Sequence, residues 1–211
     1  MKVAILGGTG AMGTGLARHL SKKNEVIIGS RDERRARDAA KRIEGASGMG
    51  YEAASRAAEL AVFAVPYSAM GEASRLSGAL SGKVAVSMIN PLKAEEGLLK
   101  FALAEGSAAQ ELAAALPESR VATAFNHVSS VFFERETLVP MDVLVAADAR
   151  ETYEEAAALV TSIPNLRPLY AGPLSEARTI EMITPLLLNL AKMNKTGSLA
   201  TKFATTRDIV R

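Results

Sequence analysis

The sequence contains no cysteine and no tryptophan, and histidine occurs at only two of its 211 positions, His19 and His127. The absence of cysteine excludes disulfides, thiolate metal sites and a cysteine nucleophile. The two histidines belong to no cluster with metal-ligand spacing, so we expect no metal site. Redox chemistry in this chain would therefore need a bound organic cofactor.

An excess of charge of one sign is also missing. The 25 basic and 23 acidic residues leave a net charge of +2, and no long block of like charges stands out, so nucleic acid is not an expected partner. The longest apolar stretch, Ile183 to Ala191, is broken by Pro185 and Asn189 and is shorter than the roughly 20 residues that span a bilayer. The residues Met1 to Leu6 predict a strand that runs into glycines rather than a signal peptide. We expect a soluble, cytoplasmic protein without a membrane partner.

Apolar runs alternate with amphipathic stretches, a pattern typical of an α/β protein of the Rossmann type, with a doubly wound, mainly parallel sheet. We expect a Rossmann domain over residues 1–170 and a small C-terminal helical appendage over residues 171–211. The expected strands lie near residues 2–7, 25–29, 60–65, 83–88, 120–125, 142–146 and 167–170, with 46–51 a candidate for one more. The expected helices lie near residues 11–22, 33–43, 68–77, 95–116 and 150–162. His19 is expected on the surface of the first helix.

The C-terminal helix has an unusual composition. It is expected to begin near Ser175, and from Ile180 to Met193 it is apolar nearly all round. Packing one face on a sheet would leave much of this apolar surface exposed, so a second surface must cover it. The covering surface is either another part of the same subunit or a second copy of the chain, and we expect a homodimer.

A glycine-rich turn, Gly8-Thr9-Gly10-Ala11-Met12-Gly13, joins the first strand to the first helix. A dinucleotide needs its pyrophosphate close to the free N–H groups at a helix N-terminus, where side chains would hold it away. Gly8 would permit the tight turn, Gly10 the close approach of phosphate and Gly13 the close packing of helix on strand. The strand before the turn and the helix after it supply the context that this motif requires.

The second strand ends in Gly29-Ser30-Arg31, where an NAD enzyme would place an acidic residue on the ribose 2'-hydroxyl. A carboxylate there would repel a 2'-phosphate, whereas Arg31 offers a planar fork of donors and Ser30 a hydroxyl. One turn further on, Arg34 or Arg35 can close on the same phosphate, and Arg35 is the preferred second contact. The sequence therefore predicts NADP rather than NAD.

Other strand ends should line the same cofactor, because ligands lie beyond the carboxyl ends of the strands in open parallel sheets. This rule points to Val65-Pro66-Tyr67, to Ile89-Asn90-Pro91 and to residues 126–130. Ser129 and Ser130 are candidates for contact with the nicotinamide carboxamide.

His127 is the one histidine expected near the nicotinamide ring, so it is the candidate catalytic acid or base. The Tyr-x-x-x-Lys pair of many carbonyl reductases is absent, and no other proton donor for a carbonyl is evident. This favours hydride transfer between two bound cofactors, where positioning of the rings does most of the work.

The whole chain resembles the coenzyme F420:NADP oxidoreductases, small archaeal and bacterial enzymes that pass a hydride between a deazaflavin and NADP. The resemblance is carried by Lys2-Val3-Ala4-Ile5-Leu6-Gly7-Gly8-Thr9-Gly10, by Val26-Ile27-Ile28-Gly29-Ser30-Arg31 and by Ala171-Gly172-Pro173-Leu174-Ser175. The most specific block is Leu186-Leu187-Leu188-Asn189, with Thr184-Pro185 before it and Gly197 after it.

The resemblance implies a set of NADP contacts, transfer of the pro-S hydride and a homodimer built through the C-terminal helices. The implied contacts are Thr9, Gly10, Ala11, Met12, Ser30, Arg31, Arg35, Val65, Ala69, Asn90 and Ser130. It also implies that the deazaflavin stacks against the nicotinamide, near residues 126–130 and the C-terminal segment. This chain has Asn126 and Ser129 where family members carry histidine and proline.

Two other functions remain open on the sequence alone. One is NADPH-dependent reduction of a different acceptor, namely free flavin, a ferric complex or an imine. The other is a non-catalytic NADP sensor, which would have no open pocket beside the nicotinamide.

Overall fold

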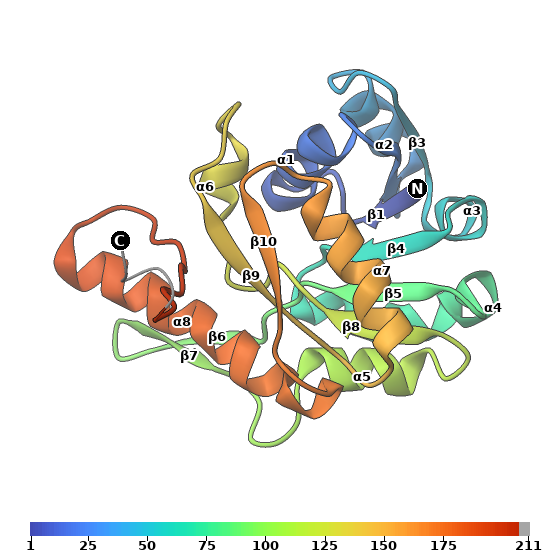
Figure 1. Ribbon diagram of the computed structural model, residues 1–211. Coiled ribbons are helices and arrows are strands. Elements are labelled where there is room, and N and C mark those ends of the chain that lie inside the picture. Colours follow the sequence, from blue (N-terminus) through green and yellow to red (C-terminus); the bar gives the residue numbers. More distant parts are fainter. Residues whose placement is uncertain (207–211) are drawn as a thin grey trace.

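The computed structural model describes residues 1–206, so residues 207–211 of the expected C-terminal segment lie outside the described residues. The expected α/β architecture is confirmed: an eight-stranded sheet in the order β10-β9-β8-β5-β4-β1-β2-β3 carries helices on both faces (Figure 1). Every neighbouring pair of strands is parallel except β8 and β9. The strands of this sheet are β1 (Lys2–Leu6), β2 (Glu25–Ser30), β3 (Ala46–Gly50), β4 (Leu60–Phe63), β5 (Val84–Ser87), β8 (Arg120–Thr123), β9 (Met141–Ala147) and β10 (Leu166–Tyr170).

Helices cover both faces because the central strands are apolar on both sides. Val3 and Ile5 of β1 point into one core and Ala4 and Leu6 into the other, as the two-residue period of a strand requires. The first core is closed by α1 (Ala11–Leu20), α2 (Glu33–Ala40), α6 (Ser130–Phe133) and α7 (Arg150–Thr161). The second is closed by α3 (Tyr51–Ala57), α4 (Ser77–Leu80), α5 (Ala108–Ala115) and the start of α8 (Ala177–Asn194).

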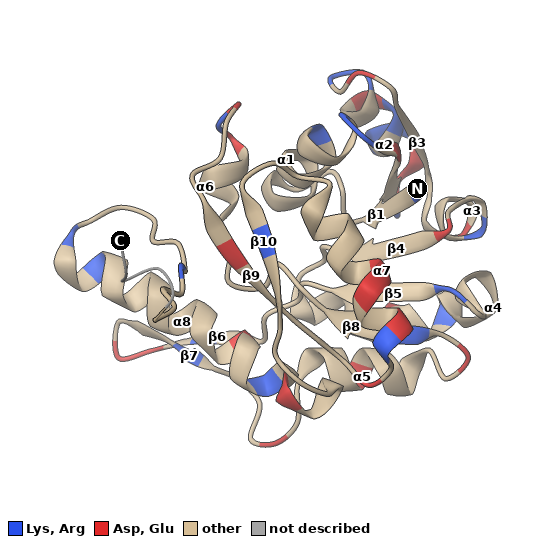
Figure 2. Cartoon of the chain, in the orientation of Figure 1, with Lys and Arg blue, Asp and Glu red and all other residues tan. Residues whose placement is uncertain are grey.

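Charge lies mostly on the helices and loops, and the strands are largely uncharged (Figure 2). An acidic segment on β9 and a basic segment on β10 stand out in that view, and they are the paired Asp142 and Arg167. Within residues 1–206, no helix is long and apolar enough to cross a membrane.

The candidate strand at 46–51 forms as the edge strand β3. Its Gly48 has a packing role, because a Cβ there would lie 2.3 Å from the carbonyl carbon of Ala36 in α2. The missing side chain therefore lets α2 lie directly on the edge of the sheet.

The expected helix over 95–116 is wrong. Its first part is a β-hairpin, β6 (Leu92–Glu95) and β7 (Leu98–Phe101), and only Ala108–Ala115 is helical. Glu96 and Gly97 have φ angles of 51° and 77°, the left-handed pair that a tight hairpin turn needs. The expected helix near 68–77 is a 3₁₀ helix, Tyr67–Leu76.

His19 is buried, so its predicted place on the surface is wrong. Its Nε2 lies 3.0 Å from the carbonyl oxygen of Arg135, and its ring packs against Phe133. The loop after α6 thus covers a face of α1 that the helical pattern alone leaves open.

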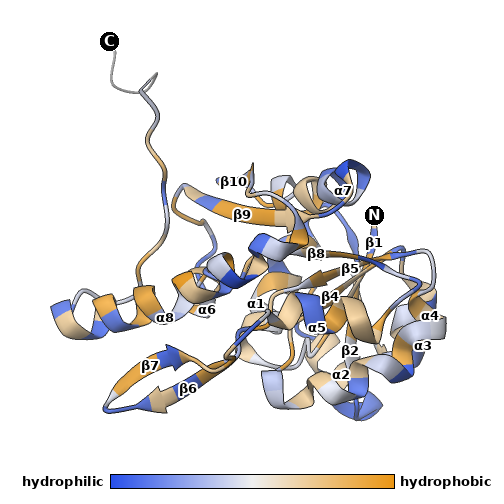
Figure 3. Cartoon of the chain, turned by 90° about the horizontal axis from the view of Figure 1, so that it is seen from below, coloured by the Kyte–Doolittle hydropathy of each residue, from blue (hydrophilic) through white to orange (hydrophobic). Residues whose placement is uncertain are grey.

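The helix α8 begins in the core and then leaves the body of the molecule. Ala177, Ile180, Glu181 and Pro185 are buried, while the hairpin β6–β7 projects beside the outer half of the helix (Figure 3). The Asn189 side chain joins the two, since its amide accepts from Leu99 N–H at 2.9 Å and donates to Leu99 O at 2.7 Å.

Candidate cofactor cleft and second pocket

The turn between β1 and α1 presents uncapped backbone N–H groups. Gly7 has a φ of +87°, and its N–H donates to Gly29 O at 3.1 Å, which draws the turn toward β2. Gly10 is the N-cap of α1 and has no side chain to occupy the first-turn N–H groups. Such a helix start binds anions, because its N–H groups and dipole both point at the ligand.

The three glycines of the motif divide into two roles. A Cβ on Gly13 would lie 2.6 Å from Gly8 Cα, and one on Gly8 would lie 2.9 Å from Ile28 Cγ2. A Cβ on Gly10 would meet only Gly7 O, at 3.5 Å. Gly8 and Gly13 are therefore required by the packing of the turn, whereas Gly10 leaves space on the open side.

The end of β2 is ordered by hydrogen bonds around Asp32. The Oδ1 of Asp32 accepts from the N–H groups of Arg34 and Arg35, at 2.9 and 3.3 Å, and so caps α2. Ser30 Oγ accepts from Asp32 N–H at 3.2 Å. Although Asp32 brings a carboxylate to this corner, the backbone of α2 already engages it.

Arg31 points its exposed guanidinium toward the 3₁₀ helix, where it lies 3.5 Å from Glu72. An ion pair this exposed holds the side chain only weakly, so a phosphate can compete for it. Arg31 and Arg35 both line the cleft described next.

A cleft of about 680 Å³ lies along the carboxyl ends of the parallel strands. Gly8, which packs under the turn, and the predicted strand-end residues Tyr67, Ile89, Pro91 and His127 do not line it. Most of the other predicted cofactor-binding residues do. Those residues include Thr9, Gly10, Ala11, Met12, Gly13, Ser30, Arg31, Arg35, Val65, Pro66, Ala69, Asn90 and Ser130.

Several residues of this cleft were not predicted from the sequence. Tyr51 follows β3 and Met88 follows β5, so the strand-end rule would have found both had these strand ends been placed correctly. Thr184 and Leu188 also line the cleft, but they come from α8. Nothing in the local sequence signals that α8 reaches the cofactor edge.

A second cavity of about 330 Å³ adjoins the cleft. The two share Asn126, Val128, Ser129, Thr184 and Leu188 in their linings, so they meet along this line of residues. The remaining lining comes from His127, from α8 (Leu187, Ala191 and Lys192) and from the segment after it (Gly197, Ser198 and Leu199). The cavity is therefore mainly apolar, with polar groups at the junction with the cleft.

Hydrogen bonds fix this junction. Phe125 has a φ of +64°, a strained conformation for a residue with a side chain. Asn126 is buried, accepts from Thr123 Oγ1 at 2.8 Å and donates to Ile89 O at 3.1 Å. The tight turn at Phe125 thus holds the Asn126 backbone against the ends of β5 and β8.

The Asn126 carbonyl oxygen accepts hydrogen bonds from two other parts of the chain. Asn90 Nδ2 donates to it at 2.8 Å, and Thr184 Oγ1 lies 2.9 Å away. These contacts connect the end of β5 to α8 across the line where the two cavities meet. The junction is lined by amide, hydroxyl and apolar groups, and it presents no strong acid.

His127 lies in the second cavity and does not line the cleft. Leu144 N–H donates to its Nε2 at 3.1 Å, and Thr201 Oγ1 lies 3.0 Å from its Nδ1. Burial lowers the pKa of His127 to about 4, despite the nearby Asp142 carboxylate. At neutral pH the ring is therefore uncharged and both nitrogens are engaged, an arrangement typical of a structural histidine.

Comparison with known proteins identifies the family. A family model described as NADP oxidoreductase, coenzyme F420-dependent, matches residues 2–91. The F420-dependent NADP reductase of Methanothermobacter marburgensis is 37% identical, over 92% of this chain and 94% of the relative. That of Methanocaldococcus jannaschii is 35% identical, over 90% of this chain and 92% of the relative. This chain belongs to the coenzyme F420-dependent NADP oxidoreductases.

Solved structures agree with the fold of this oxidoreductase family. A crystal structure from Arthrobacter sp. FB24 superimposes with a TM-score of 0.86 at 23% identity, over 97% of this chain and 100% of that chain. An imine reductase of Streptomyces aurantiacus gives a TM-score of 0.63 at 20% identity and covers 92% of this chain but only 64% of that one. At these identities the likeness concerns the fold alone.

Proposed function

We propose that this chain transfers a hydride between coenzyme F420 and NADP. The observation that carries the proposal is the meeting of two cavities at Asn126 and Thr184, one with a dinucleotide-binding turn and one with mainly apolar walls. In the reaction, reduced deazaflavin gives a hydride with its two electrons to the nicotinamide of NADP and releases one proton to water.

The cleft offers a distinct set of contacts to each part of NADP. The uncapped start of α1 suits the pyrophosphate, and Ser30, Arg31 and Arg35 suit the 2'-phosphate. The far end of the cleft, at Asn90 and Ser130, is left for the nicotinamide. The nicotinamide would then lie next to the second cavity.

The second cavity suits an aromatic ring system. Leu187, Leu188 and Ala191 form an apolar stripe on α8 that can pack against a ring face. The chain's part in the reaction is to bind and orient the two rings, since hydride transfer between cofactors needs no strong acid. Asn126 and Thr184 would fix the distance between the rings through the junction that they form.

The test is an assay of the purified protein with NADPH and coenzyme F420, followed by the absorbance of the deazaflavin. Parallel reactions contain FMN, ferric citrate or a cyclic imine in place of coenzyme F420. We expect turnover with the deazaflavin and little with the others. Turnover of another acceptor alone would overturn the proposal, and NADPH binding without any turnover would favour a sensor.

The proposal includes a homodimer that is built through α8 and acts in the cytoplasm, without a nucleic-acid partner. Met182, Leu186 and Met193 lie along α8 and are 46%, 55% and 60% exposed, which is unfavourable for large apolar side chains in water. In this arrangement residues 1–170 hold NADP, while the segment from residue 171 supplies the dimer contact and part of the second cavity.

A further inference from the structure

A gap in the main sheet is filled by the C-terminal segment. The strands β8 and β9 pair at Ala122 with Ala147 and at Thr123 with Ala146, so among residues 1–206 no strand lies beside the first half of β9 on this side. The N–H groups of Asp142 and Leu144 point into this gap, since alternate residues of a strand donate to the same side. Buried N–H groups without a partner would be costly.

Both of these N–H groups have partners from outside the sheet. Asp142 N–H donates to Thr201 O at 2.9 Å, and Leu144 N–H donates to His127 Nε2 at 3.1 Å. Thr201 thus occupies the place of a strand residue, and the His127 ring occupies the next position along β9.

The hydrogen bonds define the tautomer of His127. Leu144 N–H can only donate, so Nε2 carries no proton and Nδ1 carries it. The Nδ1–H then donates to Thr201 Oγ1 at 3.0 Å, and the threonine hydroxyl donates to Asp142 O, also at 3.0 Å. Each donor in this chain of contacts has one acceptor, so the network is internally consistent.

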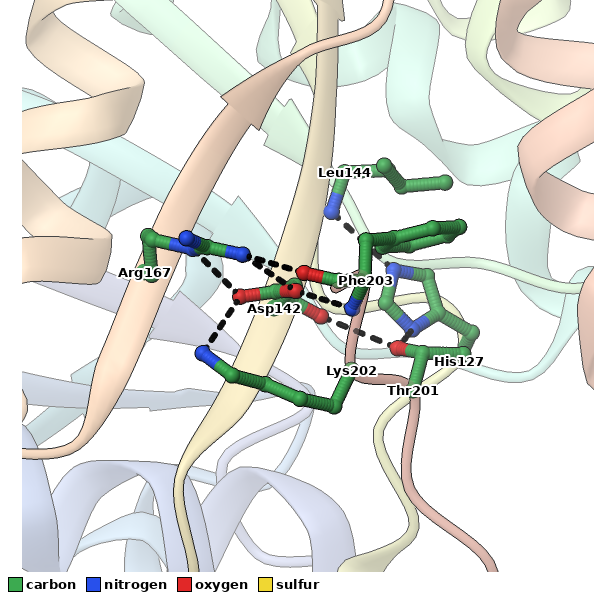
Figure 4. Close-up of polar contacts among 7 residues, drawn as sticks. All are labelled: His127, Asp142, Leu144, Arg167, Thr201, Lys202 and Phe203. Atoms are coloured by element: carbon green, nitrogen blue, oxygen red, sulfur yellow. Dashed lines mark hydrogen bonds and ion pairs between the residues drawn. The ribbon is translucent and has the colours of Figure 1, made fainter. Parts of the chain in front are cut away.

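The Asp142 carboxylate holds the two residues that follow Thr201, namely Lys202 and Phe203 (Figure 4). It is fully buried, accepts from Phe203 N–H at 2.6 Å and forms an ion pair with Arg167 at 2.7 Å. Lys202 Nζ lies 3.3 Å from it, and Arg167 also donates to Phe203 O. Burial alone would raise the pKa of Asp142, but these donors outweigh burial and lower the pKa to about 2.

The residues just before this network form the outer wall of the second cavity. Gly197, Ser198 and Leu199 line it, and Ser198 Oγ lies 3.2 Å from Ser129 Oγ. Ser198 and the two residues before it are otherwise exposed. The wall therefore lies between the end of α8, where Thr196 N–H donates to Ala191 O, and the residues Thr201 to Phe203, and its position depends on how both ends are held.

We propose that His127, Asp142 and Thr201 form a C-terminal latch that positions residues 197–199 as the wall of the second-substrate pocket. His127 is then a positioning residue, because it acts through the segment that it holds. The identity of the pocket's ligand rests on the proposed function, whereas the latch itself does not.

The experiment removes the threonine hydroxyl and then restores it. In Thr201→Val the His127 Nδ1–H loses its acceptor while the side chain keeps its size, and Thr201→Ser restores the hydroxyl. Thr161→Val is the matched control, since the Thr161 hydroxyl bonds only to Ala157 O within its own helix in the described contacts. Each full-length protein is assayed for KM and kcat with coenzyme F420 and NADPH, and for the rate of trypsin cleavage after Lys195 and Lys202.

For Thr201→Val we expect cleavage in this segment and the KM for coenzyme F420 each to rise about tenfold, as the loss of one to two hydrogen bonds implies. The KM for NADPH should stay within about twofold, and Thr201→Ser should return to wild-type behaviour. An unchanged cleavage rate would show that these contacts do not hold the segment. Faster cleavage with an unchanged KM for coenzyme F420 would show that the segment does not shape the pocket.

The two proposals fail in different ways. If the wild-type protein does not turn over coenzyme F420, the proposed function fails, but the trypsin rates of the three variants still test the latch. If the wild type is active and the variants are cleaved alike, only the latch fails.

Discussion

At the scale of single residues, Arg31 has the most direct consequence for cofactor choice. It lines the cleft at the end of β2, and its guanidinium makes an exposed contact with Glu72 at 3.5 Å. We expect Arg31→Ala to raise the KM for NADPH roughly 10- to 100-fold, since a hydrogen bond to a charged group contributes about 1.5–3 kcal/mol. The KM for NADH, which has no 2'-phosphate, should change little.

Steady-state kinetics with both nucleotides measures this effect. Arg34→Ala is the control, because Arg34 lies nearby in the first turn of α2 but does not belong to the lining of the cleft. Equal losses with NADPH and NADH in Arg31→Ala would contradict the assignment of Arg31 to the 2'-phosphate.

Glu181 makes stability depend on pH. Its fully buried carboxylate accepts from the N–H groups of Ala108 and Ala109 at the start of α5, at 2.9 and 3.0 Å. Burial outweighs these donors and raises the pKa of Glu181 to about 7. A carboxyl whose pKa is raised in the folded state contributes stability below its unfolded pKa and loses it as pH rises through the folded pKa.

The quantity to follow is the free energy of unfolding of the wild type minus that of Glu181→Gln. This difference in the free energy of unfolding should fall as pH rises from about 4.5 to 7, by up to about 1.4 kcal/mol per pH unit. Denaturant unfolding at a series of pH values measures it, and Glu118→Gln, at an exposed position, gives the baseline. A difference that is flat across this range would show that Glu181 ionises normally.

The residues that could be predicted from the sequence are those whose neighbours along the chain define their task. Gly10 and Arg31 belong to short motifs whose geometry is local, so strand, turn and helix suffice to place them. His127 was predicted near the nicotinamide, but its partners are Leu144 and Thr201, up to 74 residues away. No local sequence pattern predicts such contacts.

At the scale of elements, the turn between β1 and α1 contains one glycine that packing requires and another that faces the ligand side. Gly13→Ala would force a Cβ to within 2.6 Å of Gly8 Cα, whereas the Cβ of Gly10→Ala meets nothing closer than 3.5 Å. We expect Gly13→Ala to lower the free energy of unfolding by about 1–3 kcal/mol, as overpacking does.

Gly10→Ala should keep nearly wild-type stability and bind NADPH at least about tenfold more weakly, because its methyl group would project where a phosphate approaches. Chemical denaturation and NADPH fluorescence titration separate the two effects. If Gly10→Ala lost stability instead of affinity, Gly10 would have to be reassigned to the packing of the turn.

Elements were predictable where one signal dominated. The buried strands and α7 follow from apolar runs and amphipathic periodicity. The hairpin β6–β7 was mistaken for helix because its residues alone favour neither state strongly, and Asn189 of α8 supplies backbone-like partners to Leu99. A contact from residues far along the chain decided the local structure, as tertiary context often does.

At the scale of the whole molecule, the exposed side of α8 predicts self-association. We expect the wild type to sediment as a dimer and Leu186→Lys to shift it toward monomer, because a charge in an apolar interface is costly. Val131→Lys is the matched control, since Val131 is also an exposed apolar residue, 44% accessible, but lies on α6.

Analytical ultracentrifugation over a range of concentrations measures both variants. A wild type that remains monomeric at high concentration would contradict the dimer. Dissociation caused by Val131→Lys and not by Leu186→Lys would place the interface elsewhere.

The plan of the whole molecule was only partly predictable. Alternating strands and helices predict the doubly wound sheet and the edge that binds the cofactor. The second cavity could not be predicted from local patterns, because three segments far apart in the sequence form it: α8, residues 126–129 and residues 197–199. The resemblance to a family suggested its location, but the chain's own pattern did not.

The position of the latched segment at the end of the chain also determines when each binding site is completed during synthesis. A ribosome delivers the chain from its N-terminal side, and domains fold as they emerge. Most residues of the cofactor cleft lie between Gly7 and Ser130, whereas the pocket wall and the segment that the latch holds lie between Gly197 and Phe203. The nascent protein should therefore be able to hold its nucleotide well before it can enclose a hydride partner. Ribosome-bound chains stalled at increasing lengths would acquire these two capacities one after the other.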